Sequence, residues 1–300
     1  MSSVPCPVTF IGTGIMGSPM AEHLIANGHQ LHVHNRTREK TKSLLEQGAV
    51  WHDTPESAAA ASAAVITMLG LPADVDQVYF GQEGAGGILA AAKPGSLLID
   101  MTTSSPNLAE RISQAAEERG MESLDAPVSG GDVGARNASL VVMVGGRQEA
   151  FDRGVPLLNQ LGKSITLLGP AGSGQRCKLV NQIAVAVGMV AWCEALAVAK
   201  AAGLDPSVAQ GVISGGAAGS WGLSNLAPRA LREDFKPGFL VRHLVKDILL
   251  AQEEADRHGV HLPGLEVAQK LYESLEKKGF GEEGTQLLLR SYDTNEGSQR

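Results

Sequence analysis

Two polar residues, Lys178 and Asn181, interrupt a long apolar stretch of the sequence. They lie in the segment 172–203, which lacks proline and is rich in alanine, valine, leucine and methionine, as is typical of one long helix. Residues three apart share a helix face, and Gln175 adds a polar group one turn earlier. A lone lysine near a helix start is usually solvated. On a buried helix it needs a partner, and it can exchange a proton with a reacting oxygen.

A second candidate site is a glycine-rich turn near the start of the chain. Its residues are Gly12, Thr13, Gly14, Ile15, Met16 and Gly17. They follow an apolar run and open a helical pattern, where such glycines allow a tight turn, close approach of the backbone to a ligand, and close helix–strand packing. The turn predicts a dinucleotide whose diphosphate binds at the helix N-terminus. An ordinary glycine turn is the alternative.

The end of the second expected strand bears on the choice of cofactor. NAD-selective sites usually place Asp or Glu there, but this sequence has Asn35, Arg36 and Thr37. Arg36 can pair with a 2′-phosphate and stack on adenine, while Thr37 and Arg38 can add donors. We therefore expect NADP(H) to be favoured, and NAD(H) stays open. The alternative is that Arg36 is a solvated turn residue.

A third candidate is the string DAPVSGG at 125–131, which follows an expected strand. The Ser129 hydroxyl and the N–H groups of Gly130 and Gly131 can hold a carboxylate in a backbone concavity. A plain proline–glycine turn is the alternative, and it explains the glycines but not the whole string.

The elements that must position these residues alternate in the first half of the chain. Strands are expected at 8–11, 30–34, 63–69, 96–101, 122–124, 140–144 and 164–168, with helical patterns between the earlier ones. This alternation predicts an α/β fold: an N-terminal Rossmann-type dinucleotide-binding domain with a parallel-rich sheet over 1–169. An all-helical domain over 170–290 should follow, joined through the long buried helix, with a polar tail at 291–300.

Composition limits the partners. With 43% hydrophobic and 19% charged residues, the 300-residue chain is typical of a soluble globular protein, and its net charge of −7 argues against nucleic acid. Gln182 and Glu194 interrupt the apolar helix, so no membrane span is expected. Cys6, Cys177 and Cys193 form neither a metal-ligand spacing nor an even disulfide set. We expect no metal site and a cytoplasmic location.

Together these segments resemble the β-hydroxyacid dehydrogenase family, which includes 3-hydroxyisobutyrate dehydrogenases, tartronate semialdehyde reductases and glyoxylate/succinic semialdehyde reductases. The matching stretches are FIGTGIMGSPMAEHL, DAPVSGG, GSGQRCKLVNQ and KDILLA, in the family's order and spacing over essentially the whole chain. They are highly specific for the superfamily and much less so for a substrate. The NRT at 35–37 is most similar to the NADP-using glyoxylate/succinic semialdehyde branch.

The resemblance implies a role for individual residues. Lys178 would be the catalytic acid/base, Asn181 would orient the substrate, and the 129–131 segment would receive its carboxylate. The other implied positions are Thr103 near nicotinamide and substrate, Met68 and Leu69 along the cofactor cleft, Phe239 closing the pocket, and Lys246 and Asp247 bordering cofactor and active site. The sequence departs from the family at Thr13, His23 and Thr102, and His23 leaves the packing of its helix open.

The implied activity is NAD(P)-dependent interconversion of a short β- or γ-hydroxyacid and its semialdehyde. A partly desolvated lysine near an oxidised nicotinamide has its pKa lowered from roughly 10.4 toward working pH. The substrate would be a small aldehyde or hydroxyacid that bears a carboxylate. A homodimer or homotetramer is expected, because the 172–203 helix is apolar all round and aromatic residues are scarce.

Other readings stay open. Imine reductases share the two-domain layout but typically lack the lysine, and a simple aldehyde reductase would not need the carboxylate site. 6-Phosphogluconate dehydrogenase has similar fingerprints on a much longer chain with a phosphate-binding tail. A non-catalytic nucleotide-binding module would need only the glycine turn.

Overall fold

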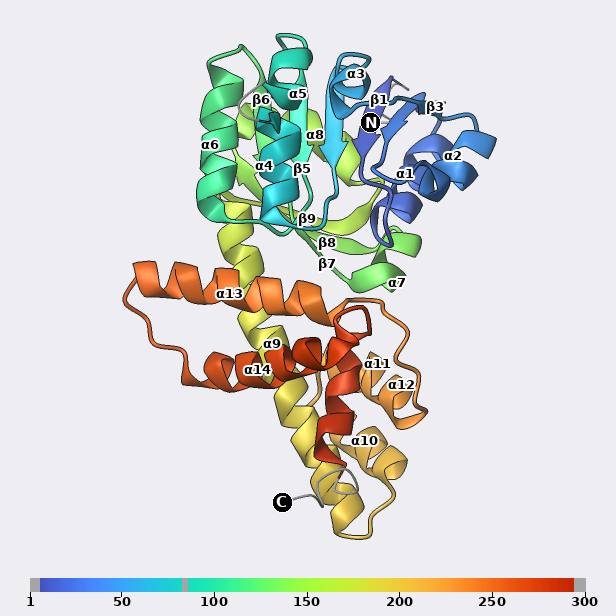
Figure 1. The fold of residues 1–300 in the computed structure, drawn as a ribbon, viewed down its shortest axis with the longest axis vertical. Coiled ribbons are helices and arrows are strands. Elements are labelled where there is room, and N and C mark those ends of the chain that lie inside the picture. Colours follow the sequence, from blue (N-terminus) through green and yellow to red (C-terminus); the bar gives the residue numbers. More distant parts are fainter. Residues whose placement is uncertain (1–5, 83–85, 294–300) are drawn as a thin grey trace. The chain divides into compact units, whose positions relative to one another are not determined.

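The computed structural model of the protein describes residues 6–82 and 86–293 (Figure 1). Within them the chain forms two compact units, which divide between Lys178 and Leu179. The first unit combines a sheet with helices, and the second is built from helices.

The first unit contains one mixed sheet. Its strands in the described residues are β1 (Val8–Ile11), β2 (Leu31–His34), β3 (Val50–Trp51), β4 (Ala64–Thr67), β5 (Leu97–Asp100), β6 (Glu122–Asp125), β7 (Val128–Ser129), β8 (Leu140–Gly146) and β9 (Gly162–Gly169). They lie in the order β3-β2-β1-β4-β5-β6-β8-β7, with β9 beside β8. β1 to β6 are parallel, and β8 runs antiparallel to β6 and β7. The parallel order is that of a Rossmann fold, so the predicted fold class is confirmed.

Two short strands, β3 and β7, were not predicted from the sequence. β3 and β7 have 2 residues each, which is too short for an alternating pattern to stand out. The remaining strands lie where they were expected, with boundaries that differ by a few residues.

The parallel strands end at one level of the sheet. Ile11 is in register with both His34 and Thr67, Thr67 is in register with Asp100, and Asp100 with Asp125. The last residues of β1, β2, β4, β5 and β6 therefore form one row. Each turn that leaves this row starts at the same edge, where open α/β sheets bind their ligands.

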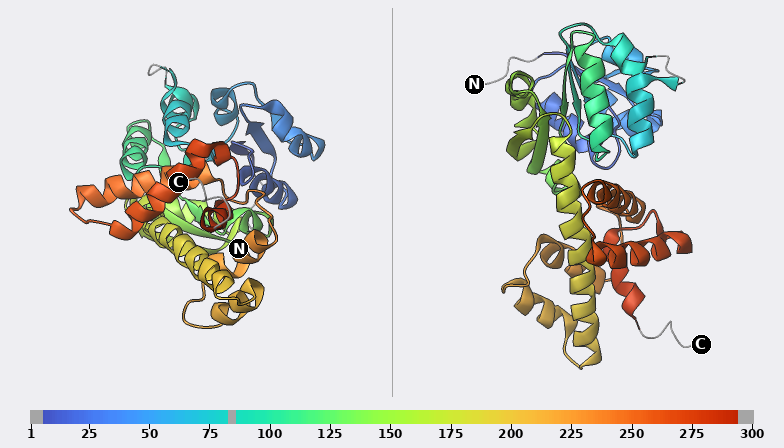
Figure 2. Two further views of the ribbon diagram at one scale, coloured as in Figure 1. Left: turned by 60° about the horizontal axis from the view of Figure 1, so that its bottom comes forward. Right: turned by 90° about the vertical axis from the view of Figure 1, so that its left-hand side faces the viewer.

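Helices cover both faces of the sheet, as Figure 2 shows in its right-hand view. In the described residues they are α1 (Gly17–Ala26), η1 (Arg38–Thr41), α2 (Lys42–Glu46), α3 (Pro55–Ala59), α4 (Pro72–Phe80), α5 (Gly87–Ala91), α6 (Pro106–Glu117), α7 (Gly131–Arg136), α8 (Gln148–Leu158) and the start of α9 (Ser173–Ala201). Phe10 and Ile66 join one buried cluster with Met20 of α1, whereas the neighbouring Val65 joins a second with Tyr79 of α4. Burial on two faces explains why the strands read as nearly continuous apolar runs.

The second unit is helical in the residues described. After α9 come α10 (Pro206–Ser214), α11 (Trp221–Asn225), α12 (Ala227–Leu231), α13 (Val241–Arg257), α14 (Pro263–Leu275), η3 (Glu276–Phe280) and η4 (Thr285–Tyr292). One buried cluster, which includes Trp192, Leu244 and Tyr272, forms its core. Residues 294–300 of the expected polar tail lie outside the described residues.

The two units divide within α9. The sequence placed a boundary at 169, where β9 ends, but the first compact unit continues to Lys178. The start of α9 belongs with the sheet because the backbone N–H groups of Gly172 and Gln175 both donate to the Asp125 carboxylate at the end of β6.

By length and composition alone, α9 could cross a membrane, and it is the one helix of the described residues that meets this test. Core helices of soluble proteins meet it too. Gln175, Lys178 and Gln182 are buried polar residues of α9, a pattern that a lipid-facing helix would not favour. The absence of a membrane partner stays a prediction.

Candidate active site

The glycine turn joins β1 to α1 at the row of strand ends. Gly12 has a φ of +96°, which strongly favours glycine, and a side chain there would collide with the Met68 carbonyl group. A side chain at Gly17 would collide with the Gly12 carbonyl oxygen, so this glycine permits close helix–strand packing. A Cβ atom at Gly14 would meet nothing within 4 Å. The backbone at Gly14 is therefore open to a ligand.

Asn35 fixes this turn from the neighbouring strand end. Its Oδ1 accepts a hydrogen bond from the Thr13 N–H at 3.0 Å, and its Nδ2 donates to the Thr37 carbonyl at 2.8 Å. Asn35 thereby joins the glycine turn to the 35–37 segment, whose residues bear on the choice of cofactor.

Arg36 extends from the same segment into solvent. Its side chain is 90% exposed and lies 3.7 Å from Asp74, a surface pair that contributes little to stability. Arg38 is held differently, with its guanidinium 5.3 Å from the centre of the Trp51 ring. The donors of Arg36 thus remain accessible to an anion.

A buried carboxylate, Asp100, organises the ends of β4 and β5. Its Oδ1 accepts from the Thr67 hydroxyl at 2.8 Å and from the Thr102 N–H at 3.1 Å. Thr102 in turn accepts from the Leu69 N–H at 2.8 Å. The Met68–Leu69 turn and the loop that contains Thr103 are held together by these bonds.

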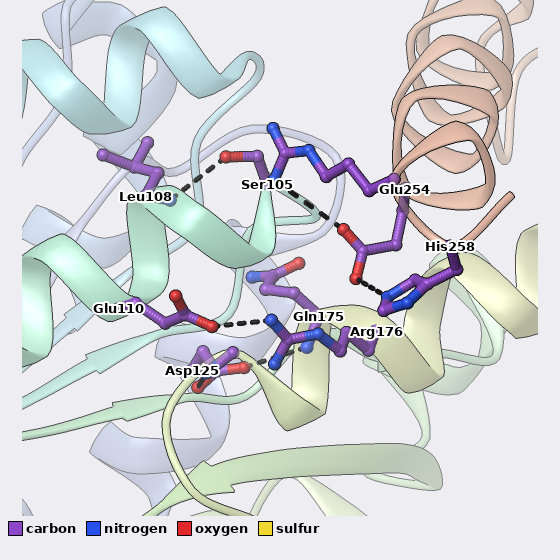
Figure 3. Close-up of polar contacts among 10 residues, drawn as sticks. Ser105, Leu108, Glu110, Asp125, Gln175, Arg176, Glu254 and His258 are labelled. Atoms are coloured by element: carbon purple, nitrogen blue, oxygen red, sulfur yellow. Dashed lines mark hydrogen bonds and ion pairs between the residues drawn. The ribbon is translucent and has the colours of Figure 1, made fainter.

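A second buried carboxylate, Asp125, holds the start of α9 (Figure 3). Its two oxygens accept from Gly172 N and Gln175 N, each at 2.8 Å. Burial raises the pKa of Asp125 to about 6, against the lowering effect of these hydrogen bonds, and the Asp100 charge raises it further. Gly145 leaves room for this carboxylate, because a Cβ atom there would lie 2.5 Å from Oδ1.

Lys178 follows Gln175 by one helical turn. It belongs to the first unit and the residue is 7% exposed, so it is not the solvated lysine that a helix start alone would suggest. The capped start of α9 fixes the backbone from which it projects.

The Ser129–Gly131 segment leads from β7 into α7. Gly130 and Gly131 have φ values of +132° and +61°, and the three residues are half-buried. His23 of α1 resolves the packing left open by the sequence, because its Nε2 lies 3.0 Å from the carbonyl oxygens of both Ala135 and Arg136. Carbonyl oxygens only accept, so Nε2 carries a proton. His23 thereby attaches α1 to the end of α7.

In the second unit, α9 and α13 share a chain of polar contacts. Asn181 Nδ2 donates to Gln182 Oε1 at 2.8 Å, and Gln182 Nε2 donates to Asp247 Oδ2 at 2.6 Å. The Asp247 side chain is 1% exposed, and its Oδ1 lies 3.0 Å from Lys246 Nζ. Asp247 therefore positions Gln182 and Lys246 from a buried location.

His243, which was not predicted as a site residue from the sequence, lies one turn before Lys246 on α13. Its ring centre is 6.5 Å from that of Phe239. Burial lowers the pKa of His243 to about 4, helped by the charges of Lys246 and Arg242, so the ring is neutral near pH 7. The sequence offered one signal for it: Lys246 and Asp247 follow His243 by three and four residues, so the three side chains share one face of the helix.

The structure groups the predicted site residues by unit. The first unit holds the glycine turn, Asn35–Thr37, Met68, Leu69, Thr103, Ser129–Gly131 and Lys178; the second holds Asn181, Phe239, Lys246 and Asp247. Lys178 and Asn181 are one turn apart on the unbroken helix α9.

Comparison with known proteins identifies the family to which the chain belongs. Residues 7–169 match the family model of the NAD binding domain of 6-phosphogluconate dehydrogenase, and residues 172–292 match that of the NAD-binding of NADP-dependent 3-hydroxyisobutyrate dehydrogenase. The chain is 44% identical over 282 residues to the probable 3-hydroxyisobutyrate dehydrogenase-like 1, mitochondrial, of Arabidopsis thaliana, covering 94% of this chain and 84% of that protein. It is 39% identical over 270 residues to 2-hydroxy-3-oxopropionate reductase of Escherichia coli, covering 90% and 91%.

The chain belongs to the β-hydroxyacid dehydrogenase family. A solved structure of Mycobacterium tuberculosis 3-hydroxyisobutyrate dehydrogenase with L-serine has a TM-score of 0.86 and 30% identity, covering 97% of this chain and 100% of that one. The protein is accordingly an oxidoreductase with an NAD(P)-binding domain.

The residues of this family member fit such a cofactor. Gly14 leaves its backbone open, and the Thr13 hydroxyl is buried without a hydrogen-bond partner among the described residues. A buried hydroxyl group of this kind is suited to a ligand oxygen.

A metal site is not evident in residues 6–82 and 86–293, where no group of three or more metal-ligating side chains gathers. The three cysteines are unpaired in the structure.

The raised pKa of Asp125 predicts a pH-dependent stability difference between the wild type and Asp125→Asn. The native state favours the protonated acid more than the unfolded state does. The stability that this protonation adds to the wild type, relative to Asp125→Asn, should therefore be fully present below about pH 4 and should be lost as pH rises through about 6. The change should be on the order of 3 kcal/mol in the free energy of unfolding, measured with urea, because the pKa moves by about two units. Exposed Asp152→Asn is the control. A difference that grows with rising pH would contradict the assignment.

Proposed function

We propose that the protein is an NADP-preferring dehydrogenase or reductase that interconverts a short hydroxyacid and its semialdehyde, with Lys178 as the general acid and base. The observation that carries the proposal is the position of Lys178. It is buried, and it projects from a helix start bonded to a strand end in the row that bears the glycine turn.

The proposed chemistry divides between cofactor and protein. A bound nicotinamide cofactor would supply or accept the hydride. Lys178 Nζ would donate a proton to the substrate oxygen in the direction of reduction and accept one in oxidation. Asn181, one turn later on α9, would hold the same substrate without a change of charge.

The Ser129–Gly131 segment supports a carboxylate anchor. The Ser129 hydroxyl and the N–H groups of Gly130 and Gly131 lie in a turn with two positive φ values. Such turns point consecutive N–H groups at an anion. Relatives named for 3-hydroxyisobutyrate and 2-hydroxy-3-oxopropionate favour small acids as the substrate class.

Rival activities would leave part of this arrangement unused. An imine reductase would not need Lys178, a simple aldehyde reductase would not need the anion site, and a non-catalytic module would need neither. The glyoxylate/succinic semialdehyde branch remains our choice within the family, because the NRT at 35–37 supports NADP(H).

An assembly of two or four copies also remains a proposal. α10 buries none of its residues, and Val208 and Val212 on it are 63% and 71% exposed. Val180 and Val198 of α9 are also exposed. Apolar faces of this kind favour self-association. A cytoplasmic location, and the lack of nucleic-acid and membrane partners, remain predictions from composition.

The carboxylate anchor predicts which substrates are turned over. A two- to four-carbon semialdehyde should be reduced, whereas its amide or methyl ester should lose most of kcat/KM, because the anion site would leave its donors unpaired. The substrate panel contains glyoxylate, succinic semialdehyde, methylmalonate semialdehyde and tartronate semialdehyde, each beside its neutral analogue. Every compound is assayed with NADPH and with NADH. Equal reduction of acids and neutral aldehydes would remove the carboxylate site and favour the simple reductase.

Arg36→Ala should weaken NADPH binding much more than NADH binding, since only NADPH carries the 2′-phosphate. A charge-assisted hydrogen bond contributes on the order of 1.5–3 kcal/mol, so Kd for NADPH should rise roughly 10- to 100-fold. The measurement is fluorescence titration of both cofactors. Lys42→Ala removes an exposed charge from nearby α2 and should leave both values unchanged. Equal weakening of both cofactors by Arg36→Ala would make Arg36 a bystander.

Light scattering should give at least a dimer at micromolar concentration, because association would bury the exposed valines of α9 and α10. A monomeric mass at that concentration would refute the proposed assembly.

A further inference from the structure

Gln175, whose side chain is drawn in Figure 3, is fully buried, and both ends of its amide are hydrogen-bonded. Its Oε1 accepts from Ser104 N at 2.9 Å, and its Nε2 donates to the Thr102 carbonyl at 2.8 Å. The side chain is 0% exposed. A buried amide without partners is costly, so these two bonds determine its orientation.

The two bonds enclose one residue, Thr103. They fix the carbonyl group before it and the N–H group after it, so the Gln175 side chain sets the path of the backbone on both sides of Thr103. The neighbouring bonds lie farther out: Thr102 accepts from Leu69 N, and Ser105 caps α6 by accepting from Leu108 N. None of them constrains both sides of Thr103.

The backbone of Gln175 makes a separate connection. Its N–H donates to Asp125 Oδ2 at 2.8 Å, and Lys178 follows three residues later on the same face of α9. One residue thus joins the Thr103 loop to the helical turn that precedes Lys178.

Anchoring of the helix itself does not require the Gln175 side chain. Arg176 pairs with Glu110 of α6 at 2.6 Å, and Asp125 caps the backbone. Among the described residues, the Gln175 side chain makes two hydrogen bonds, and both go to the Thr103 loop.

We propose that Gln175 is a positioning residue, which fixes Thr103 relative to the α9 turn that carries Lys178. This inference rests on the proposed function for its kinetic consequence. Misplacing groups around a reacting centre can lower the rate on the order of 10²-fold without direct contact with the substrate.

The kinetic test uses three variants of the full chain. Gln175→Met keeps the side-chain volume but removes both bonds, and it should lower kcat roughly 10- to 100-fold with little change in Kd for NADPH. Gln175→Glu keeps the acceptor for Ser104 N and should retain more of kcat. Gln160→Met is the control, because Gln160 is a half-buried glutamine of the same unit that contacts His29, and its kcat should match the wild type.

Amide hydrogen exchange gives a readout that needs no turnover. Exchange at Ser104 N should accelerate roughly tenfold or more in Gln175→Met and remain at the wild-type rate in Gln160→Met. If Gln175→Met does not fold, Gln175→Glu is compared instead, with an intermediate acceleration expected.

The outcomes separate the two proposals. Unchanged exchange at Ser104 N in Gln175→Met would overturn the positioning role. Accelerated exchange together with wild-type kcat would overturn it too, because Gln175 would then stabilise the loop without affecting catalysis. If the wild type reduces no member of the panel, the proposed function fails, while accelerated exchange would still support the fixation of Thr103 by Gln175.

Discussion

The Asp125 carboxylate at the end of β6 is the contact on which most of the first unit's candidate site depends. It accepts two backbone N–H groups at the start of α9, and that helix carries Gln175 and Lys178. Burial raises its pKa to about 6, because removing the carboxylate from water disfavours its charged form. A carboxylate held there at neutral pH provides two acceptors at a helix N-terminus, where the helix dipole also favours negative charge.

The row of strand ends explains why residues distant in the sequence share a function. Because β1, β2, β4 and β5 end in register, the glycine turn, the NRT segment, the Met68–Leu69 turn and the Thr103 loop all leave the sheet at one edge. The start of α9 follows β9, which ends at the same level, since Gly169 is in register with Gly145 and Gly145 with Asp125 of β6. Asp100 and Asp125 are neighbours in that row and each binds the segments beside it. In the second unit, Asp247 holds Gln182 and Lys246 in a similar way from a buried position.

The sequence predicted the fold well where a pattern was long and local. The parallel strands, the glycine turn and the long helix follow from apolar periodicity and glycine spacing. The two-residue strands β3 and β7 lacked such a pattern. The contacts of Asp125, Gln175 and His23 join residues more than 45 positions apart, so no local signal could show them. Asp247 was identified only through the family resemblance, and its burial beside Gln182, a residue 65 positions away, is shown by the structure.

The most direct test of the account is the turnover of Lys178→Ala with the best substrate of the panel, alongside Lys200→Ala. Lys200 lies on the same helix, is exposed and pairs with Asp293, so its loss should leave kcat unchanged. Lys178→Ala should lose on the order of 10²–10⁴ in kcat, the usual effect of one general acid or base, while Kd for NADPH stays at the wild-type value. Small primary amines added to the assay should restore part of the lost rate. Wild-type turnover in Lys178→Ala would contradict the mechanism.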